Sequence, residues 1–394
     1  MLVYFDGEPI MQKLEGSEIS RAVNTPFLIL QNPEDKKYYL SGGDLWFASK
    51  DPLTGWENIS NVPKNINKEA KKLIGGDSIT ATQQSTIPEI ITATKPTELI
   101  QTNGEPNYLN IANTTLLYVE NSDNHIFLDI NTQLHYLLVS GRWFTSKKLE
   151  GPWSFIEANT LPSDFARIPE GSAKDIVLAS VPGTKASKEA LIEAQIPQTA
   201  TVDRKTATTN VEYDGTPKFE PIEGTRMEYA VNTASTVIKS DQTYYAVDNG
   251  VWFESSSPQG PWTVATERPG EINNIPPSNP AYNTKYVYIY DYTPDVVYVG
   301  YTSGYTNSFI YGSTVVYGTG YYYKPWYGRY YYPHPMTYGY NMYYNPYAGW
   351  SFCFHISYNY YYTNYYPRYN YFCGWDCPPY YHPNRPPKKQ KKKR

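Results

Sequence analysis

Short apolar runs separated by turn-forming residues dominate the first 270 positions of the chain. In the clearest stretch, such runs follow one another at 116–119, 126–129, 135–139, 142–146 and 153–156. Runs of this length, bounded by Gly, Pro, Asn, Asp and Ser, are typical of short β-strands. Similar runs at 2–5, 27–30, 37–40 and 45–49, and again within 206–270, predict three small antiparallel meanders of four to five strands each.

Each predicted meander carries one tyrosine and two tryptophans in constant register. The first tryptophan lies seven residues after the tyrosine, and the second lies ten residues further on. The three sets are Tyr39, Trp46 and Trp56; Tyr136, Trp143 and Trp153; and Tyr245, Trp252 and Trp262. A fixed spacing of this kind indicates an internal repeat of stacked or arrayed sheet units.

An Asx-Gly-x-Pro turn leads each copy and begins at Asp6, Asn103 and Asp214. Asp or Asn followed by Gly supplies the backbone conformations that a tight reversal needs. A shared asparagine follows the proline by fifteen residues in every copy, at Asn24, Asn121 and Asn232. The turn and the asparagine therefore belong to the repeat.

The connectors between copies predict two short helices, at 65–74 and 184–195, because apolar residues recur there at helical spacing. Ile-Pro pairs at 87–88, 196–197 and 275–276 each precede a turn proline by 18 to 20 residues. On that spacing a fourth, degenerate repeat begins near Tyr286, with strands at 286–291, 296–299 and 314–317. This unit lacks both tryptophan elements.

These patterns predict an all-β protein of repeated small antiparallel sheets that resemble propeller blades, with two short connecting helices and a tyrosine-rich, irregular C-terminal region. The expected parts are a first repeat (1–63), a connector with a helix (64–96), a second repeat (97–163), a second connector with a helix (164–205), a third repeat (206–270), a degenerate fourth repeat with a tyrosine-rich segment (271–350) and a disordered Tyr/Pro-rich, basic tail (351–394).

Composition separates the C-terminal region from the repeats. Most of the 42 tyrosines lie from Tyr282 onward, and Asp376 is the single acidic residue after position 311. The chain ends in a basic run from Lys388 to Arg394. A terminal run of like charge is usually a solvated tail, but it also suits an anionic surface as a partner.

Targeting signals are absent from the printed chain. No stretch approaches 18 apolar residues, so the sequence predicts no transmembrane helix. The first residues lack the basic and apolar regions of a signal peptide. Because the first repeat starts almost at Met1, we expect the natural protein to extend further at its N-terminus.

Metal binding and catalysis receive little support. The three cysteines do not indicate a disulfide framework. Cys353, His355, Cys373 and Cys377, with His382, are weak candidates for a zinc site, because their spacing matches no standard finger. Motifs of nucleophilic catalysis and of phosphate binding are absent, and nothing indicates specific nucleic-acid recognition. We therefore predict no metal and no cofactor.

The repeat tyrosines and tryptophans are the candidate ligand-binding residues, and two interpretations of them stay open. Aromatic rings at fixed positions in repeats are commonly core residues. Alternatively, the rings of Trp143 and Trp153 lie close together and form a platform on which sugar rings stack, with Tyr136 as a polar neighbour. Spacing alone does not separate the two interpretations.

The stretch from His135 to Ile156, with its Gly-x-Trp-Phe and Gly-Pro-Trp elements, and the segments at 161–169, 177–184 and 194–200 resemble a group of uncharacterised bacterial envelope proteins. Members of this group are often described as similar to carbohydrate-binding modules of families V and XII. The Gly-Pro-Trp piece also resembles a blade turn of five-bladed glycosidase propellers. The resemblance covers most of residues 1–350. It implies a sheet-repeat fold, a polysaccharide or peptidoglycan partner, and a location in the cell envelope or outside the cytoplasm.

Three hypotheses for function follow. The first is a non-enzymatic binding or structural protein of the bacterial cell envelope that recognises glycan or peptidoglycan through Trp and Tyr faces. The second is a scaffold or adhesion protein that self-associates through its tyrosine-rich C-terminal region. The third is a glycan hydrolase, which needs an Asp/Glu pair in a cleft. Accessible tryptophan pairs favour the first, buried pairs with an exposed tyrosine surface favour the second, and close carboxylates in a pocket favour the third.

Overall fold

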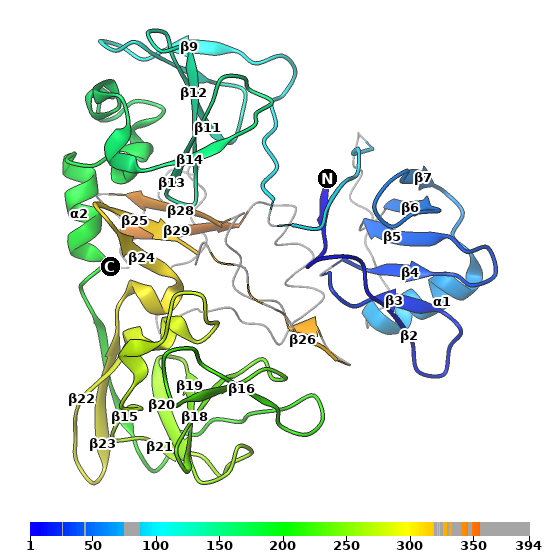
Figure 1. Cartoon of the computed structure of the whole chain (residues 1–394), viewed down its shortest axis with the longest axis vertical. Helices are drawn as coiled ribbons and strands as arrows, with labels where there is room; N and C mark the ends of the chain where they lie inside the picture. The colour runs from blue at the N-terminus through cyan, green and yellow to red at the C-terminus, as the bar shows by residue number, and fades with distance from the viewer. Residues whose placement is uncertain are drawn as a thin grey trace, which may run out of the picture.

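The protein is built mainly from β-strands in small antiparallel sheets, which confirms the predicted fold class. The computed structural model describes residues 1–25, 27–42, 45–74, 87–95, 97–318, 321, 323, 326–328, 331–332, 340–345 and 349–354 (Figure 1). The strands of this part form three six-stranded sheets and several smaller ones. The basic run from Lys388 to Arg394 lies outside the described residues.

Each predicted meander is a six-stranded antiparallel sheet in which consecutive strands are neighbours. Repeat 1 contains β2 (Met11–Lys13), β3 (Ser20–Ala22), β4 (Ile29–Gln31), β5 (Tyr38–Gly42), β6 (Leu45–Ser49) and β7 (Glu57–Ile59). Repeat 2 contains β9 (Tyr108–Asn110), β10 (Leu116–Val119), β11 (His125–Asp129), β12 (Leu134–Val139), β13 (Arg142–Ser146) and β14 (Ser154–Ile156). Repeat 3 contains β16 (Phe219–Pro221), β17 (Glu228–Ala230), β18 (Thr236–Ser240), β19 (Thr243–Asp248), β20 (Val251–Ser255) and β21 (Thr263–Val264).

The prediction of four to five strands per repeat was therefore too low. The missed strands are short and partly polar, such as Met-Gln-Lys in β2 and Ser-Arg-Ala in β3, so they carry no apolar run. The strand expected at 2–5 is present as β1 (Leu2–Tyr4). It pairs in parallel with β8 (Ile91–Ala93) instead of joining the meander.

The Asx-Gly-x-Pro turn and the shared asparagine bind each other in all three repeats. The Asn24 side-chain amide donates to the carbonyl oxygens of Asp6 and Glu8, at 3.2 and 2.7 Å, and its oxygen accepts from the Ile10 amide at 2.8 Å. Asn121 and Asn232 make the same three bonds in their own repeats, at 2.8 to 2.9 Å. One side chain satisfies three backbone groups of the turn, which explains the constant spacing between proline and asparagine.

Replacing Asn232 with Ala should lower the free energy of unfolding of repeat 3 by about 2 to 4 kcal/mol, because three backbone groups lose their partner. Asn232 is 0% exposed, so water does not readily take its place. Urea unfolding followed by tryptophan fluorescence measures the loss. Asn121→Ala is a matched control, because Asn121 makes the same bonds in a more exposed loop and should cost less. Equal losses at the two positions would contradict this account.

The segment after each meander folds over one face of its own sheet. In repeat 1 this cover is α1 (Lys64–Ile74), whose Ile66 and Ala70 are buried against the sheet. The cover of repeat 2 contains the 3-10 helices η1 (Ala158–Thr160), η2 (Ser163–Arg167) and η3 (Asp175–Ser180), and that of repeat 3 contains η4 (Ile272–Asn274) and η5 (Tyr282–Tyr286). The second predicted helix is α2 (Lys185–Glu193). Thr184 caps it, because the Thr184 hydroxyl accepts from the Ser187 amide at 3.1 Å.

The segment expected to form a fourth repeat is organised differently. β22 (Val287–Tyr292) and β23 (Val296–Tyr301) form a hairpin, and β15 (Gln198–Asp203) from the second connector pairs with β23. The third expected strand, β25 (Thr314–Tyr317), pairs instead with β24 (Ser308–Tyr311). β26 (Trp326–Tyr327) with β27 (Tyr331–Tyr332), and β28 (Tyr340–Asn345) with β29 (Gly349–Phe354), form further pairs within the region expected to be irregular.

The Ile-Pro spacing that suggested a fourth repeat does not mark equivalent positions. Ile275 is 2% exposed and belongs to the cover of repeat 3. Ile87 and Ile196, by contrast, are 63% and 59% exposed. Similar spacing along the chain therefore grouped one buried residue with two surface residues.

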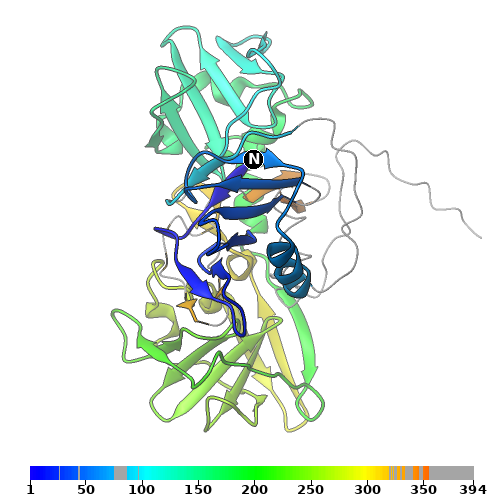
Figure 2. The ribbon, with the colours of Figure 1, turned by 90° about the vertical axis from the view of Figure 1, so that its right-hand side faces the viewer.

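Repeats 2 and 3 lie at opposite ends of the long axis, with the β24–β25 hairpin and α2 between them and repeat 1 to one side (Figures 1 and 2). The glycines of the Gly-x-Trp-Phe turns of repeats 2 and 3 allow close approach of a neighbouring strand, β25 at Gly141 and β23 at Gly250. A Cβ at Gly141 would lie 2.5 Å from the Val315 carbonyl oxygen, and one at Gly250 would lie 2.6 Å from the Tyr301 ring. Both glycines also have positive φ, at +74° and +72°, which side-chain-bearing residues rarely adopt. Close approach and backbone conformation are therefore two separate reasons for glycine in this turn.

Candidate functional site

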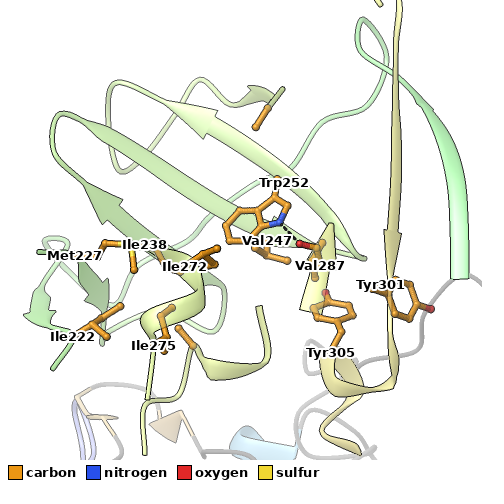
Figure 3. Close-up of a cluster of buried hydrophobic side chains, with 12 residues drawn as sticks. Ile222, Met227, Ile238, Val247, Trp252, Ile272, Ile275, Val287, Tyr301 and Tyr305 are labelled. Atoms are coloured by element: carbon orange, nitrogen blue, oxygen red, sulfur yellow. Dashed lines mark hydrogen bonds between the residues drawn. The ribbon is translucent and has the colours of Figure 1, made fainter. Parts of the chain in front are cut away.

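The first tryptophan of repeats 2 and 3 is buried between the sheet and its cover. Trp143 is 1% exposed and Trp252 is 0% exposed. Their indole N–H groups donate to backbone carbonyls of the covering segment, Trp143 to Ser180 at 2.7 Å and Trp252 to Val287 at 3.1 Å (Figure 3). A buried indole whose single donor is satisfied packs the core and also fixes the segment that it contacts.

The second tryptophan lies on the opposite face of the same sheet. Trp143 pairs with Ile156 across β13 and β14, and Trp153 stands three residues before Ile156. Because neighbouring strand residues alternate between faces, Trp153 points away from Trp143 and packs near Phe144. In repeats 1 and 3 the second tryptophan likewise stands three residues before the residue opposite the first, which is Ile59 in repeat 1 and Ala265 in repeat 3. The two rings therefore do not lie close together, and the shared platform considered from the sequence is absent in all three repeats.

None of the nine candidate residues is more than partly exposed. Tyr39, Tyr136 and Trp262 are 4%, 5% and 8% exposed. The partly buried members are Trp46, Trp56, Trp153 and Tyr245. The Tyr39 hydroxyl donates to the Asp35 carboxylate at 2.5 Å, and burial together with that carboxylate raises the pKa of Tyr39. This degree of burial favours the core interpretation of the repeat aromatics.

The zinc candidates are not assembled in the described part of the chain. His355, Cys373, Cys377 and His382 lie outside it, and only the backbone of Cys353, in β29, is described. The described residues contain no group of three or more His, Cys, Asp or Glu side chains placed to hold a metal ion. Nor do they include a helix with the length and apolar character to cross a membrane.

An open pocket in repeat 1 is lined by three carboxylates, those of Glu18, Glu34 and Glu69. The Glu18 and Glu69 carboxylates form ion pairs with Lys13 and Lys72, both at 2.8 Å. Glycoside hydrolysis uses a pair of carboxyl groups that act on one bond, whereas two of the three carboxylates of this pocket are held by lysines. The pocket therefore gives the hydrolase hypothesis little support.

An exposed aromatic surface lies on the β15–β23–β22 sheet. Val297 and Val299 of β23 are buried toward repeat 3, so Tyr298 between them points to the open side. Tyr288 pairs with Gly300 on this open side, and a β-bulge between Ile289 and Asp291 places Tyr290 there as well. We call the surface formed by Tyr288, Tyr290 and Tyr298 the tyrosine face.

The rings of Tyr288 and Tyr290 are stacked against each other on the tyrosine face. The ring centroids of Tyr288 and Tyr290 are 6.1 Å apart, and the ring planes are inclined by only 18°. Tyr290 is 52% exposed and Tyr298 is 41% exposed, with the exposed Thr199 of β15 beside them. A Cβ at Gly300 would lie 2.8 Å from Cε2 of Tyr290, so glycine at this position lets the ring lie against the strand.

The core of repeat 3 holds the tyrosine face in place. The Val287 carbonyl, at the start of β22, accepts from the Trp252 indole at 3.1 Å and from Nη1 of Arg268 at 3.0 Å. The Arg268 guanidinium also lies 5.0 Å from the centroid of the Tyr288 ring. Burial raises the pKa of Tyr290 and lowers that of Arg268. Trp252 thus does not contact the exposed tyrosines itself, and it helps to position β22 by binding the Val287 carbonyl.

Sequence reasoning did not select these tyrosines as site residues. The alternation Val-Tyr-Ile-Tyr from Val287 is a signal for a strand with one aromatic side. The β-bulge and the pairing with β15, which lies far upstream, leave no trace in that pattern. The bulge places Tyr290 over Gly300, and the pairing with β15 places Thr199 beside it.

Comparison with known proteins supports the repeat. The model of the WXXGXW repeat (2 copies) matches residues 243–263, which hold the Gly-x-Trp elements ending at Trp252 and Trp262. No curated protein and no solved structure matches the chain. Fold and match together define a repeat protein of small antiparallel sheets, similar over this segment to WXXGXW repeat proteins.

Proposed function

We propose that this repeat protein is a non-enzymatic binding protein of the bacterial cell envelope that recognises glycan, including peptidoglycan, through the tyrosine face. The stacked rings of Tyr288 and Tyr290, of which Tyr290 is 52% exposed, carry the proposal. A sugar ring can lay its C–H face on the outer face of such a stacked pair while its hydroxyls reach neighbouring polar groups. The envelope location rests on the resemblance of the repeat to bacterial envelope proteins.

The surroundings of the tyrosine face favour a polar ligand. The exposed Thr199 and Thr201 of β15 and Asp291 of β22 border the tyrosines, and Arg268 lies over Tyr288. Protein–protein interfaces are usually more apolar at their centre and poorer in charge. Hydroxyls and charges around a few flat rings instead suit a ligand with many hydroxyl groups.

Self-association remains a second candidate, because exposed tyrosine with buried tryptophan pairs is the combination that favours a scaffold. Ile310 and Tyr311 of β24, 43% and 52% exposed, add apolar surface away from the tyrosine face. Sedimentation velocity over a range of concentrations tests this candidate. The glycan proposal expects a constant sedimentation coefficient, whereas a scaffold would give one that rises with concentration.

Co-sedimentation with insoluble peptidoglycan, chitin and cellulose tests the glycan proposal. Tyr290→Ala should weaken binding to the retained polymer by roughly tenfold, because loss of an aromatic anchor commonly costs more than 1 kcal/mol. Tyr311→Ala is a matched control: Tyr311 is equally exposed, at 52%, but lies on β24. Binding by Tyr311→Ala should equal that of the unaltered protein.

Circular dichroism of each variant shows whether it is folded. Equal binding by folded Tyr290→Ala and by the unaltered protein would overturn the proposal that the tyrosine face is the site. Absence of binding to all three polymers would overturn glycan recognition among these polymers and favour the scaffold.

A further inference from the structure

Arg268 differs from a surface arginine in being fixed beside the tyrosine face. Its Nη1 donates to the carbonyl oxygens of Lys285 and Val287, at 3.1 and 3.0 Å, and its guanidinium lies 5.0 Å from the centroid of the Tyr288 ring. These contacts use both protons of Nη1. The Nε–H and the two Nη2–H donors form the remaining edge, which has the fork geometry that binds a carboxylate with two hydrogen bonds.

The positive charge of Arg268 has no carboxylate partner among the described residues. The ion pairs of this part of the chain involve other side chains. Burial lowers the pKa of Arg268, and the phenols of Tyr288 and Tyr290 oppose this effect only in part. A partly desolvated guanidinium without an anion is costly to keep, and an anion supplied by a ligand would relieve that cost.

The two ends of the tyrosine face carry opposite charges. Arg268 lies at the Tyr288 end, and Asp291 lies on the same open side at the other end, opposite Tyr298. One oxygen of the Asp291 carboxylate accepts from the Tyr292 amide at 2.8 Å. An acidic group of a ligand is therefore attracted toward Tyr288 and repelled from Tyr298.

We infer that the ligand of the tyrosine face is a glycan bearing carboxylate groups, whose sugar rings stack on Tyr288 and Tyr290 while Arg268 binds a carboxylate. This inference rests on the proposed function and narrows it to acidic polysaccharides. It assigns Arg268 as the residue that distinguishes acidic from neutral sugars.

Native affinity electrophoresis of the full chain, in gels containing either polygalacturonate or neutral hydroxyethyl cellulose, tests the inference. The unaltered protein should be retarded more strongly by polygalacturonate. Arg268→Gln should weaken that interaction by roughly tenfold, the loss of about 1.4 kcal/mol expected from a charge-assisted bond, and leave binding to the neutral polymer unchanged. Arg268→Lys keeps the positive charge but loses the two-donor fork, so its affinity for polygalacturonate should lie between those of the unaltered protein and Arg268→Gln.

Lys205→Gln is the control for net charge, because Lys205 is an exposed cation paired with Asp295 at 2.6 Å, away from the tyrosine face. It should bind polygalacturonate like the unaltered protein. Two results would overturn the role of Arg268. One is that Lys205→Gln weakens binding to polygalacturonate as much as Arg268→Gln does. The other is that folded Arg268→Gln and folded Arg268→Lys both bind polygalacturonate like the unaltered protein. Equal retardation in both gels would overturn the acidic class but keep glycan binding. Retardation in neither gel would overturn the inference, and the proposed function falls with it when the co-sedimentation with peptidoglycan, chitin and cellulose also shows no binding.

Discussion

Replacing Trp252 with Ala should lower the free energy of unfolding of repeat 3 by about 3 to 5 kcal/mol, the usual cost of deleting a large buried ring. The indole is fully buried among Ile238, Val247 and Ile272, and its N–H bonds to the Val287 carbonyl. The substitution therefore leaves a cavity and removes one hydrogen bond that fixes β22. Urea unfolding monitored by circular dichroism measures the loss.

Two further variants separate packing from hydrogen bonding. Trp252→Phe keeps a ring but lacks the N–H, so it should cost less than Trp252→Ala. Trp46→Ala removes the equivalent residue of repeat 1, which is only partly buried, and should also cost less. A loss below about 1 kcal/mol for Trp252→Ala would show that the indole is not a core residue, since such small losses are typical of surface positions.

Acid should destabilise repeat 2 through His125. Burial, with a smaller contribution from the Lys174 charge, lowers the pKa of His125 from 6.5 to about 3. Lys174 lies just before η3, in the segment that covers this sheet face, and is itself only 8% exposed. Below pH 6.5 the unfolded chain binds a proton at His125 that the folded chain does not. The stability contributed by neutral His125 is thus complete above pH 6.5 and is lost as the pH falls toward 3.

The expected slope is up to about 1.4 kcal/mol of unfolding free energy per pH unit between pH 6 and 4. Urea unfolding of the unaltered protein and of His125→Gln at several pH values measures it. The difference between the two proteins removes the contributions of other groups, such as Asp129, whose pKa is lowered by hydrogen bonds from Thr115 and Thr132 despite burial. Parallel pH profiles for the two proteins would contradict the lowered pKa of His125.

The repeat itself could be predicted because its spacings have local causes. The fifteen residues from proline to asparagine are fixed by the bonds between Asn232 and its turn, and by their counterparts in repeats 1 and 2. The two helices follow from apolar periodicity, and Thr184 has the residue type of an N-cap. The all-β class follows from the same short-range signals.

Features that depend on long-range pairing could not be predicted. Which face each tryptophan occupies depends on the register of Trp143 with Ile156, which a loop of several residues leaves open. The third strand of the β15–β23–β22 sheet comes from a connector, so the repeat spacing suggested a fourth meander instead. The candidate site lies on this sheet, and for that reason the sequence pointed to the tryptophans of the repeats and missed Tyr288 and Tyr290.

We propose that the repeat tryptophans build the fold while the tyrosine face binds the ligand. Co-sedimentation of folded Trp252→Phe and folded Tyr290→Ala with the same polysaccharide tests it most directly. Trp252→Phe, although less stable, should keep its affinity, because Nη1 of Arg268 still donates to the Val287 carbonyl. Tyr290→Ala should lose roughly tenfold. Loss of binding in folded Trp252→Phe with retention in Tyr290→Ala would contradict this proposal and return the site to the tryptophans.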